Sequence, residues 1–263
     1  MADDKPKTNT RPRVNAFLYL AGYHLILIAS TFLYRPRSAG LRNIPRTGPL
    51  VIVANHQSNL DPPIVGTLLR RKYLMFIARV GLFRAAWFGK LLNAVGAIPV
   101  RRGEPDLPAI KTALARLEDG GAVVLFAEGS RTPHGRMQPF QRGASLLIKR
   151  AKCPVLPVGI DGFRDAWPRG TKVPTPLGPR IGIRVGKPIP AETLLSMKPD
   201  DALRHLGRAV DDLRLEARAD LRRATRGRRP ADTEGDDRTP TELWYTSEDH
   251  MPESLNDTGH TPQ

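Results

Sequence analysis

Short apolar runs and amphipathic stretches alternate along the middle of the chain, between about residues 41 and 190. The clearest run is Leu50–Ala54, a continuous aliphatic segment of the kind that forms a strand buried on both faces. The other predicted strands are Tyr73–Ala78, Ala97–Val100, Ala122–Ala127, Val155–Ile160 and Ile181–Val185. The predicted helices of this region are Pro62–Arg71, Arg84–Val95, Pro108–Asp119 and Gly143–Ala151. This alternation predicts an α/β fold with a largely parallel or mixed central sheet flanked by helices.

The N-terminal part differs from this central α/β domain, which we assign to residues 38–198. Residues 14–34 carry no formal charge and are mostly apolar. Their length is close to the roughly 20 residues that a helix needs to cross a bilayer. We therefore predict a membrane-associated helix over residues 14–37, either spanning the membrane or lying in its interface, with an ordinary buried helix as the alternative. Arginines on both sides of the segment favour the interface: Arg11, Arg13, Arg35, Arg37 and Arg42.

The C-terminal part carries a second amphipathic pattern. Residues 199–229 are predicted to form a charged amphipathic helix with a basic end, which either contacts lipid headgroups or is solvated. The leader (residues 1–13) and the tail (residues 230–263) are polar and have little to bury, so both are predicted to be disordered.

Composition narrows the partners of the protein. The chain of 263 residues has a formal net charge of +15, which implies an anionic partner such as a phosphorylated metabolite, an anionic membrane surface or nucleic acid. Aromatic residues make up 6% of the chain, and no zinc-finger spacing or basic-aromatic motif occurs, so nucleic acid is not expected. Cys153 is the single cysteine, which excludes an intrachain disulfide and fits a reducing compartment.

An H-x4-D element follows the first predicted strand, with His56 on the loop and Asp61 before a pair of prolines. This arrangement places a candidate base and its orienting carboxylate at the carboxyl end of a strand, where open α/β sheets bind their ligands. The simpler alternative makes Asp61 the N-cap of the next helix and His56 an ordinary loop residue.

Two further strand ends carry groups suited to an anion. Gly96–Arg102 ends in Arg101 and Arg102, whose guanidinium groups can bind phosphate in a bidentate manner. Phe126–Thr132 forms a turn in which Gly129 allows close approach of the backbone to a ligand. Glu128 would repel a phosphate directly, so its carboxylate is expected to orient Arg131 or to bind a hydroxyl. A polar turn with a local ion pair is the alternative.

These segments together resemble the PlsC-type glycerolipid acyltransferases, the 1-acyl-sn-glycerol-3-phosphate acyltransferase family. Four blocks of that family occur in order, and the resemblance covers roughly residues 38–190. The blocks are Asn55–Asp61, Gly96–Arg102, Phe126–Thr132 and Val155–Val158, and the similar connecting stretches are Phe83–Leu92 and Phe140–Ala144. The resemblance implies that His56 is the general base and that Asp61 orients it. It also implies a phosphate site formed by Glu128, Gly129, Ser130, Arg131, Arg101 and Arg102, and an acyl or acceptor pocket that includes Arg79 and Pro157.

The implied reaction is acyl transfer from acyl-CoA or acyl-ACP, as co-substrate, to the free hydroxyl of 1-acyl-sn-glycerol-3-phosphate, which gives phosphatidic acid. No other cofactor is implied, and no metal site is expected, because no second histidine or paired carboxylates lie near His56 at ligand spacing. The expected partners are the lysophospholipid acceptor, the acyl donor and an anionic membrane surface, with the active site on the cytoplasmic face of the cytoplasmic membrane.

Some positions depart from the family pattern. Arg101 stands at a frequently acidic position, Gln141 at a frequently basic one, and Arg79 where lysine is common, while Ala127 and Ser130 replace the usual proline and threonine. The changes at Arg101, Gln141 and Arg79 touch the acceptor region, so the acceptor could instead be glycerol-3-phosphate, another lysophospholipid or a lyso-aminolipid. A basic membrane- or nucleic-acid-binding protein with a vestigial acyltransferase site is the alternative from another class.

Overall fold

The central element of the protein is a seven-stranded sheet with the order β1-β7-β6-β2-β5-β3-β4. The computed structural model describes residues 16–71, 74–84, 89–90, 92, 97–101, 106–133 and 135–230. The strands are β1 (Arg37–Ala39), β2 (Leu50–Ala54), β3 (Leu74–Arg79), β4 (Ile98–Val100), β5 (Ala122–Phe126), β6 (Val155–Asp161) and β7 (Gly182–Val185). Neighbouring strands are parallel except β6 and β7, which are antiparallel. The predicted mixed α/β sheet is confirmed.

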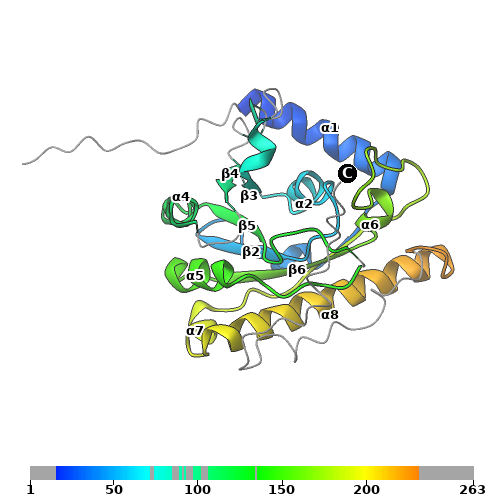
Figure 1. Cartoon of the computed structure of the whole chain (residues 1–263). Coiled ribbons are helices and arrows are strands. Elements are labelled where there is room, and N and C mark those ends of the chain that lie inside the picture. The colour runs from blue at the N-terminus through cyan, green and yellow to red at the C-terminus, as the bar shows by residue number, and fades with distance from the viewer. Residues whose placement is uncertain are drawn as a thin grey trace, which may run out of the picture.

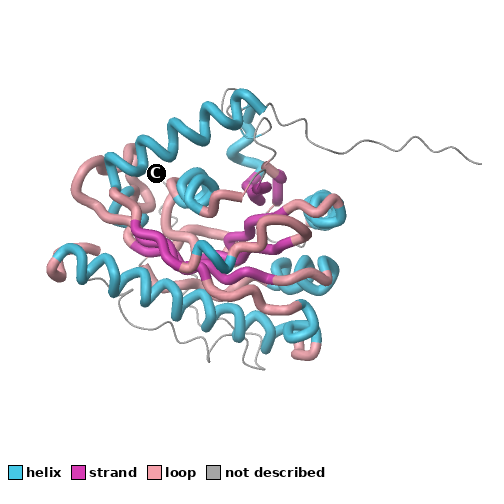
Figure 2. The backbone as a smooth tube through the Cα atoms, turned by 180° about the vertical axis from the view of Figure 1, so that it is seen from behind, coloured by secondary structure: helices cyan, strands magenta, loops and turns pink. Residues whose placement is uncertain are grey.

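Helices cover both faces of this sheet (Figures 1 and 2). The helices are α1 (Ala16–Tyr34), α2 (Asp61–Leu68), α4 (Leu107–Glu118), α5 (Arg142–Ala151), α6 (Phe163–Ala166), α7 (Ala191–Leu195) and α8 (Pro199–Thr225), with 3-10 turns at Leu41–Asn43 and Val80–Arg84. The predicted helix Arg84–Val95 lies partly outside the described residues, and the predicted leader and nearly all of the tail lie outside them. Helices α6 and α7 span one turn or little more, too short to give a periodic signal in the sequence.

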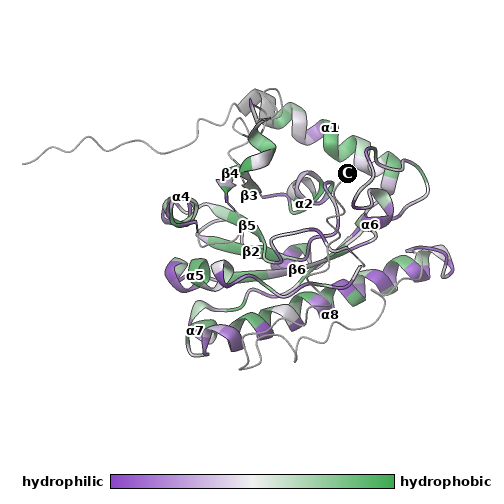
Figure 3. Cartoon of the chain, in the orientation of Figure 1, coloured by the Kyte–Doolittle hydropathy of each residue, from purple (hydrophilic) through white to green (hydrophobic). Residues whose placement is uncertain are grey.

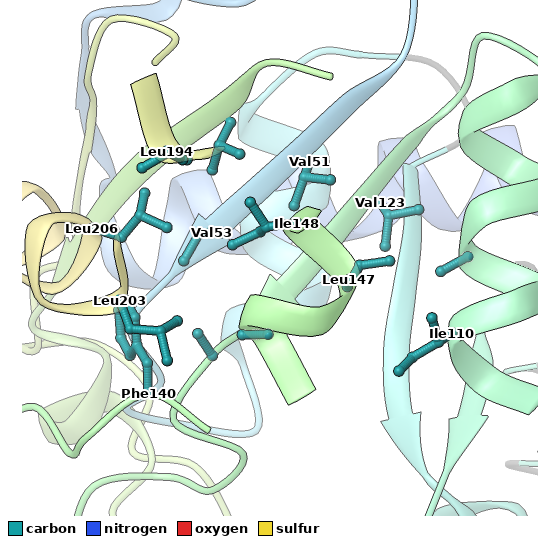
Figure 4. Close-up of a cluster of buried hydrophobic side chains, with 14 of the residues drawn as sticks. Val51, Val53, Ile110, Val123, Phe140, Leu147, Ile148, Leu194, Leu203 and Leu206 are labelled. Carbon is teal, nitrogen blue, oxygen red and sulfur yellow. The ribbon is translucent and has the colours of Figure 1, made fainter. Parts of the chain in front are cut away.

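Strand β2 lies between two apolar cores, and all of its side chains are therefore buried. Successive side chains of a strand point to opposite faces. Val51 and Val53 accordingly contact the core under α4, α5, α7 and α8 (Figure 4), whereas Leu50, Ile52 and Ala54 contact the core under α1, α2 and α6. Burial on both faces explains why the sequence of β2 is uniformly apolar.

Helix α8 is part of the covering layer of the sheet. It lies along β6 and β7 and buries Leu206, Val210 and Leu221 (Figure 1). Its backbone approaches β6 so closely that a Cβ atom on Gly159 would lie 2.2 Å from the backbone nitrogen of Arg214. A glycine at this position of β6 therefore permits the contact.

Helix α1 packs on α2, and the hydroxyl of Tyr23 donates a hydrogen bond of 3.0 Å to the carbonyl oxygen of Thr67. The helix ends at Tyr34, and Arg37, which was assigned to the same N-terminal helix, instead begins β1. Among the helices of the described ranges, none has both the length and the apolar character required to cross a bilayer.

Candidate active site

The candidate site begins where β2 ends. The side chain of Asn55 accepts a hydrogen bond from the backbone nitrogen of Ile160 (2.8 Å) and donates one to its carbonyl oxygen (2.9 Å). These bonds continue the pairing of β2 with β6 by one residue beyond Ala54. The backbone that carries His56 therefore leaves the sheet from a fixed position.

His56 and Asp61 form a hydrogen-bonded pair, with 2.7 Å between Nδ1 of the histidine and Oδ2 of the aspartate. The same carboxylate oxygen accepts hydrogen bonds from the backbone nitrogens of Gln57 (2.6 Å) and Ser58 (2.8 Å). The Asp61 side chain is fully buried, whereas 17% of the His56 side chain is exposed. The N-cap of α2 is Leu60, and no side-chain bond caps the helix, so the alternative interpretation of Asp61 as an N-cap is wrong.

The carboxylate of Asp61 sets the tautomer of His56. An ionised carboxylate is an acceptor, so Nδ1 carries the proton that it donates, and Nε2 keeps its lone pair. Burial raises the pKa of Asp61, although the hydrogen bonds from His56, Ser58 and Gln57 oppose that shift. The imidazole also stacks on the ring of Phe126, with 4.5 Å between the ring centroids. The ring is thus held on one edge and on one face.

Glu128 has a different position from the one predicted. Its Oε1 accepts a hydrogen bond from the backbone nitrogen of His56 (2.7 Å), and its Oε2 accepts one from that of Gln138 (2.8 Å). The side chain is buried, and this burial raises the pKa of Glu128 to about 8, with the negative charge of Asp61 adding to the shift. These contacts contradict the expectation that Glu128 binds an acceptor phosphate or orients Arg131. The carboxyl group instead joins the loop after β5 to the loop after β2.

The turn after β5 brings Arg131 close to His56. Gly129 has a φ of 66°, a conformation that glycine adopts without strain, and its nitrogen donates to the carbonyl oxygen of Phe126 at 3.0 Å. The backbone nitrogen of Thr132 donates to the carbonyl oxygen of His56 at 2.8 Å. Ser130 and Arg131 are half-buried between these two anchors. Burial, followed by the positive charge of Arg169, lowers the pKa of Arg131.

The remaining predicted site residues are more widely spread. Arg101 is exposed beyond the end of the edge strand β4, which β5 and β3 separate from β2. Arg79 is the last residue of β3, and Arg102 lies outside the described residues. Pro157 is buried within β6 opposite Val53, on the face that α8 covers, so it lies in the core and not at the loop edge.

Comparison with known proteins shows similarity to acyltransferases. The family model named Acyltransferase matches residues 35–161, which include both the His56 loop and the Glu128–Arg131 turn. The 1-acyl-sn-glycerol-3-phosphate acyltransferase alpha of Mus musculus is 30% identical over 188 residues, which are 67% of this chain and 62% of that protein. The chain belongs to the PlsC-type glycerolipid acyltransferases.

Other members of the PlsC-type family differ from this chain in length. The chloroplast 1-acyl-sn-glycerol-3-phosphate acyltransferase BAT2 of Brassica napus is 31% identical over 142 residues, and the chain spans 41% of its length. The crystal structure of the LPA acyltransferase PlsC from Thermotoga maritima matches with a TM-score of 0.59 at 24% identity, over 74% of this chain and 75% of that one. This structural likeness supports the shared fold.

In this PlsC-type protein, a buried polar network lies beneath the His56 loop, and sequence reasoning did not single it out. Nε2 of Gln57 donates to Oδ1 of Asp161 (2.8 Å), and Nη1 of Arg218 on α8 donates to Oδ2 of the same carboxylate (3.0 Å). The Gln57 Oε1 accepts from the backbone nitrogen of Phe163 (3.1 Å) at the start of α6. A signal existed in the sequence, because Arg218 lies on the buried face of the amphipathic helix, where Asp211 and Arg214 also interrupt the apolar residues. The network connects the loop to α6 and α8.

Proposed function

We propose that the protein transfers an acyl group from acyl-CoA or acyl-ACP to the free hydroxyl of 1-acyl-sn-glycerol-3-phosphate, forming phosphatidic acid. The observation that carries this proposal is the imidazole of His56, oriented by a fully buried Asp61 beside the half-buried Arg131. The names of the relatives from Brassica napus and Mus musculus support the same acceptor. Glycerol-3-phosphate, another lysophospholipid or a lyso-aminolipid would suit the same chemistry.

His56 acts as general base in this proposal. Its Nε2 takes the proton of the acceptor hydroxyl while that oxygen attacks the thioester carbonyl carbon. Asp61 stabilises the imidazolium that forms, as in a Ser-His-Asp triad in which the hydroxyl of the substrate replaces serine. The tetrahedral intermediate then expels the thiolate, which receives the proton from the imidazolium. Cys153 is buried in the core, and burial raises the pKa of its thiol, so it is not suited to act as a nucleophile.

The phosphate of the acceptor is bound by the turn after β5. Gly129 lets the backbone of this turn approach the phosphate, although its own N–H is engaged by the carbonyl oxygen of Phe126. The hydroxyl of Ser130 offers a donor, and the guanidinium of Arg131 can contact two phosphate oxygens at once. Because Glu128 is turned inward to the His56 backbone, its carboxylate does not compete with the phosphate for these donors.

We also propose that α1 lies on an anionic membrane surface, with the active site on the cytoplasmic face. Leu25 and Phe32 are 69% and 72% exposed, and with the exposed Ile28 they follow one another at helical spacing along α1. Apolar residues occur along much of this helix (Figure 3). Arg35 and Arg37 follow this apolar strip directly. Burial and these two neighbouring charges lower the pKa of Arg180. An apolar strip that ends among arginines suits a helix in the interface of a bilayer.

Phe32→Glu is expected to weaken binding to vesicles that contain anionic phospholipid by about tenfold or more, since burying an aromatic side chain contributes roughly 1.5–3 kcal/mol. Co-sedimentation with such vesicles measures the change. Leu107→Glu is the matched control, because Leu107 is also an exposed apolar residue but lies on α4. Wild-type binding by Phe32→Glu would show that α1 is not the contact surface.

The proposed reaction is tested with purified protein, acyl-CoA or acyl-ACP, and two acceptors that share a free hydroxyl. One acceptor is 1-acyl-sn-glycerol-3-phosphate and the other is the monoacylglycerol that lacks the phosphate. We expect kcat/KM to be higher for the phosphorylated acceptor by about 100-fold, because each hydrogen bond to a charged group contributes roughly 1.5–3 kcal/mol. Absence of product from the first acceptor with either donor would refute the proposed substrate.

A further inference from the structure

The proline- and glycine-rich loop that follows α6 is attached to the candidate site. Its first residue, Trp167, accepts a hydrogen bond at its carbonyl oxygen from Oγ of Ser58 (3.2 Å). Two residues later, Nη1 of Arg169 donates to the carbonyl oxygen of Arg131 at 3.4 Å. The loop therefore contacts both the segment that carries His56 and the segment that carries Arg131.

A tight turn presents Arg169 at this place. The backbone nitrogen of Thr171 donates to the carbonyl oxygen of Pro168 (3.3 Å), and Gly170 between them has a φ of 92°, as a type II turn requires at its third residue. The indole nitrogen of Trp167 donates to the carbonyl oxygen of Thr171 (3.0 Å) and closes the turn from the other side. Arg169 thus occupies the corner of a braced turn, where its side chain is exposed.

Within the described residues, the positive charges of Arg131 and Arg169 are only partly offset by the protein, through the more distant carboxylate of Asp61. Arg131 and Arg169 are near enough to repel each other, and the charge of Arg169 lowers the pKa of Arg131. Within the described part of the chain, neither guanidinium lies within 4 Å of a carboxylate. Two like charges held together in this way favour an anion between them, which offsets their repulsion.

We propose that Arg169 is a second ligand of the acceptor phosphate, acting with Arg131, and that the pair selects acceptors with a terminal phosphate monoester. This inference rests on the proposed acyl transfer to a phosphorylated acceptor. A phosphate monoester carries a charge of about −1.5 to −2 and three free oxygens, enough for two guanidinium groups. A phosphodiester headgroup has one negative charge and two free oxygens, and it pairs well with one arginine alone.

The test compares Arg169→Ala, Arg169→Lys and wild type in neutral detergent micelles. The acceptors are 1-acyl-sn-glycerol-3-phosphate and the monoacylglycerol that lacks the phosphate. Arg169→Ala is expected to raise KM for the phosphorylated acceptor by about 10- to 100-fold with kcat nearly unchanged. The reason is that the charge-assisted hydrogen bonds it removes stabilise the bound substrate and the transition state equally. Arg169→Lys keeps the charge but not the planar fork, so its KM for the phosphorylated acceptor is expected to lie between those of wild type and Arg169→Ala.

Lys172→Ala is the matched control, because it removes one positive charge from an exposed position of the same loop. It should leave the preference for the phosphorylated acceptor unchanged. A merely structural effect of Arg169→Ala would reduce turnover of both acceptors equally and would overturn the inference. If Arg169→Ala lost binding to anionic vesicles but kept an unchanged KM in micelles, the inference would also be overturned, because Arg169 would then be a membrane contact. A wild-type protein that did not acylate the phosphorylated acceptor would instead refute the proposed function.

Discussion

His56→Ala is expected to lower kcat by about 10²- to 10⁴-fold while the protein remains folded. The imidazole is the group that accepts the proton of the acceptor hydroxyl, and its Nδ1 is already engaged by Asp61 at 2.7 Å. Alanine removes the base but leaves the carboxylate with its backbone donors at Gln57 and Ser58. The loop that carries position 56 should therefore keep its conformation.

Initial rates with saturating donor and acceptor, measured beside thermal unfolding, separate a loss of catalysis from a loss of stability in His56→Ala. His205→Ala is the matched control, because His205 is exposed on α8. A variant that keeps more than about a tenth of wild-type kcat would contradict the assignment of His56 as base, since general-base assistance is worth at least about 10².

Asp61→Asn is expected to lower kcat by about 10²- to 10⁴-fold, comparable to the loss of the aspartate in a Ser-His-Asp triad. The amide can still accept the backbone hydrogen bonds through its oxygen, but it no longer stabilises an imidazolium. We expect no matching loss of stability. Burial raises the pKa of Asp61, which means that its ionised form is less favourable in the folded protein than in the unfolded chain.

The sign of the contribution of Asp61 to stability can be tested by measuring unfolding as a function of pH. A carboxyl group with a raised pKa in the folded state binds its proton more tightly there, so stability falls as pH rises from the ordinary pKa through the raised one. The wild-type free energy of unfolding should therefore decrease more than that of Asp61→Asn between pH 4 and neutral pH. Glu128, whose pKa is about 8, contributes a decrease of the same sign in both proteins. Equal pH dependence of the free energy of unfolding in wild type and Asp61→Asn would contradict this account. So would an equally large change of that pH dependence in the control Asp119→Asn, whose side chain is exposed.

Much of the fold follows from local patterns in the sequence. The uniformly apolar run Leu50–Ala54 forms a central strand, and the apolar spacing after Pro199 forms a long helix. Strand β1 (Arg37–Ala39) was missed because its three residues carry no apolar signal, and its extended form depends on pairing with β7, far along the chain. The order of the strands likewise depends on contacts between distant segments.

The sequence by itself predicted the pairing of His56 with Asp61, because one turn of six residues leaves the two side chains within reach of each other and the segment resembles a block of the PlsC-type family. The tertiary structure decided everything that needs a distant partner. It buried Glu128 against the His56 backbone, placed Arg218 beneath the loop through Asp161, and brought Arg169 next to Arg131. Each of these contacts joins residues more than 35 positions apart in the chain, so the local order of the residues does not encode it.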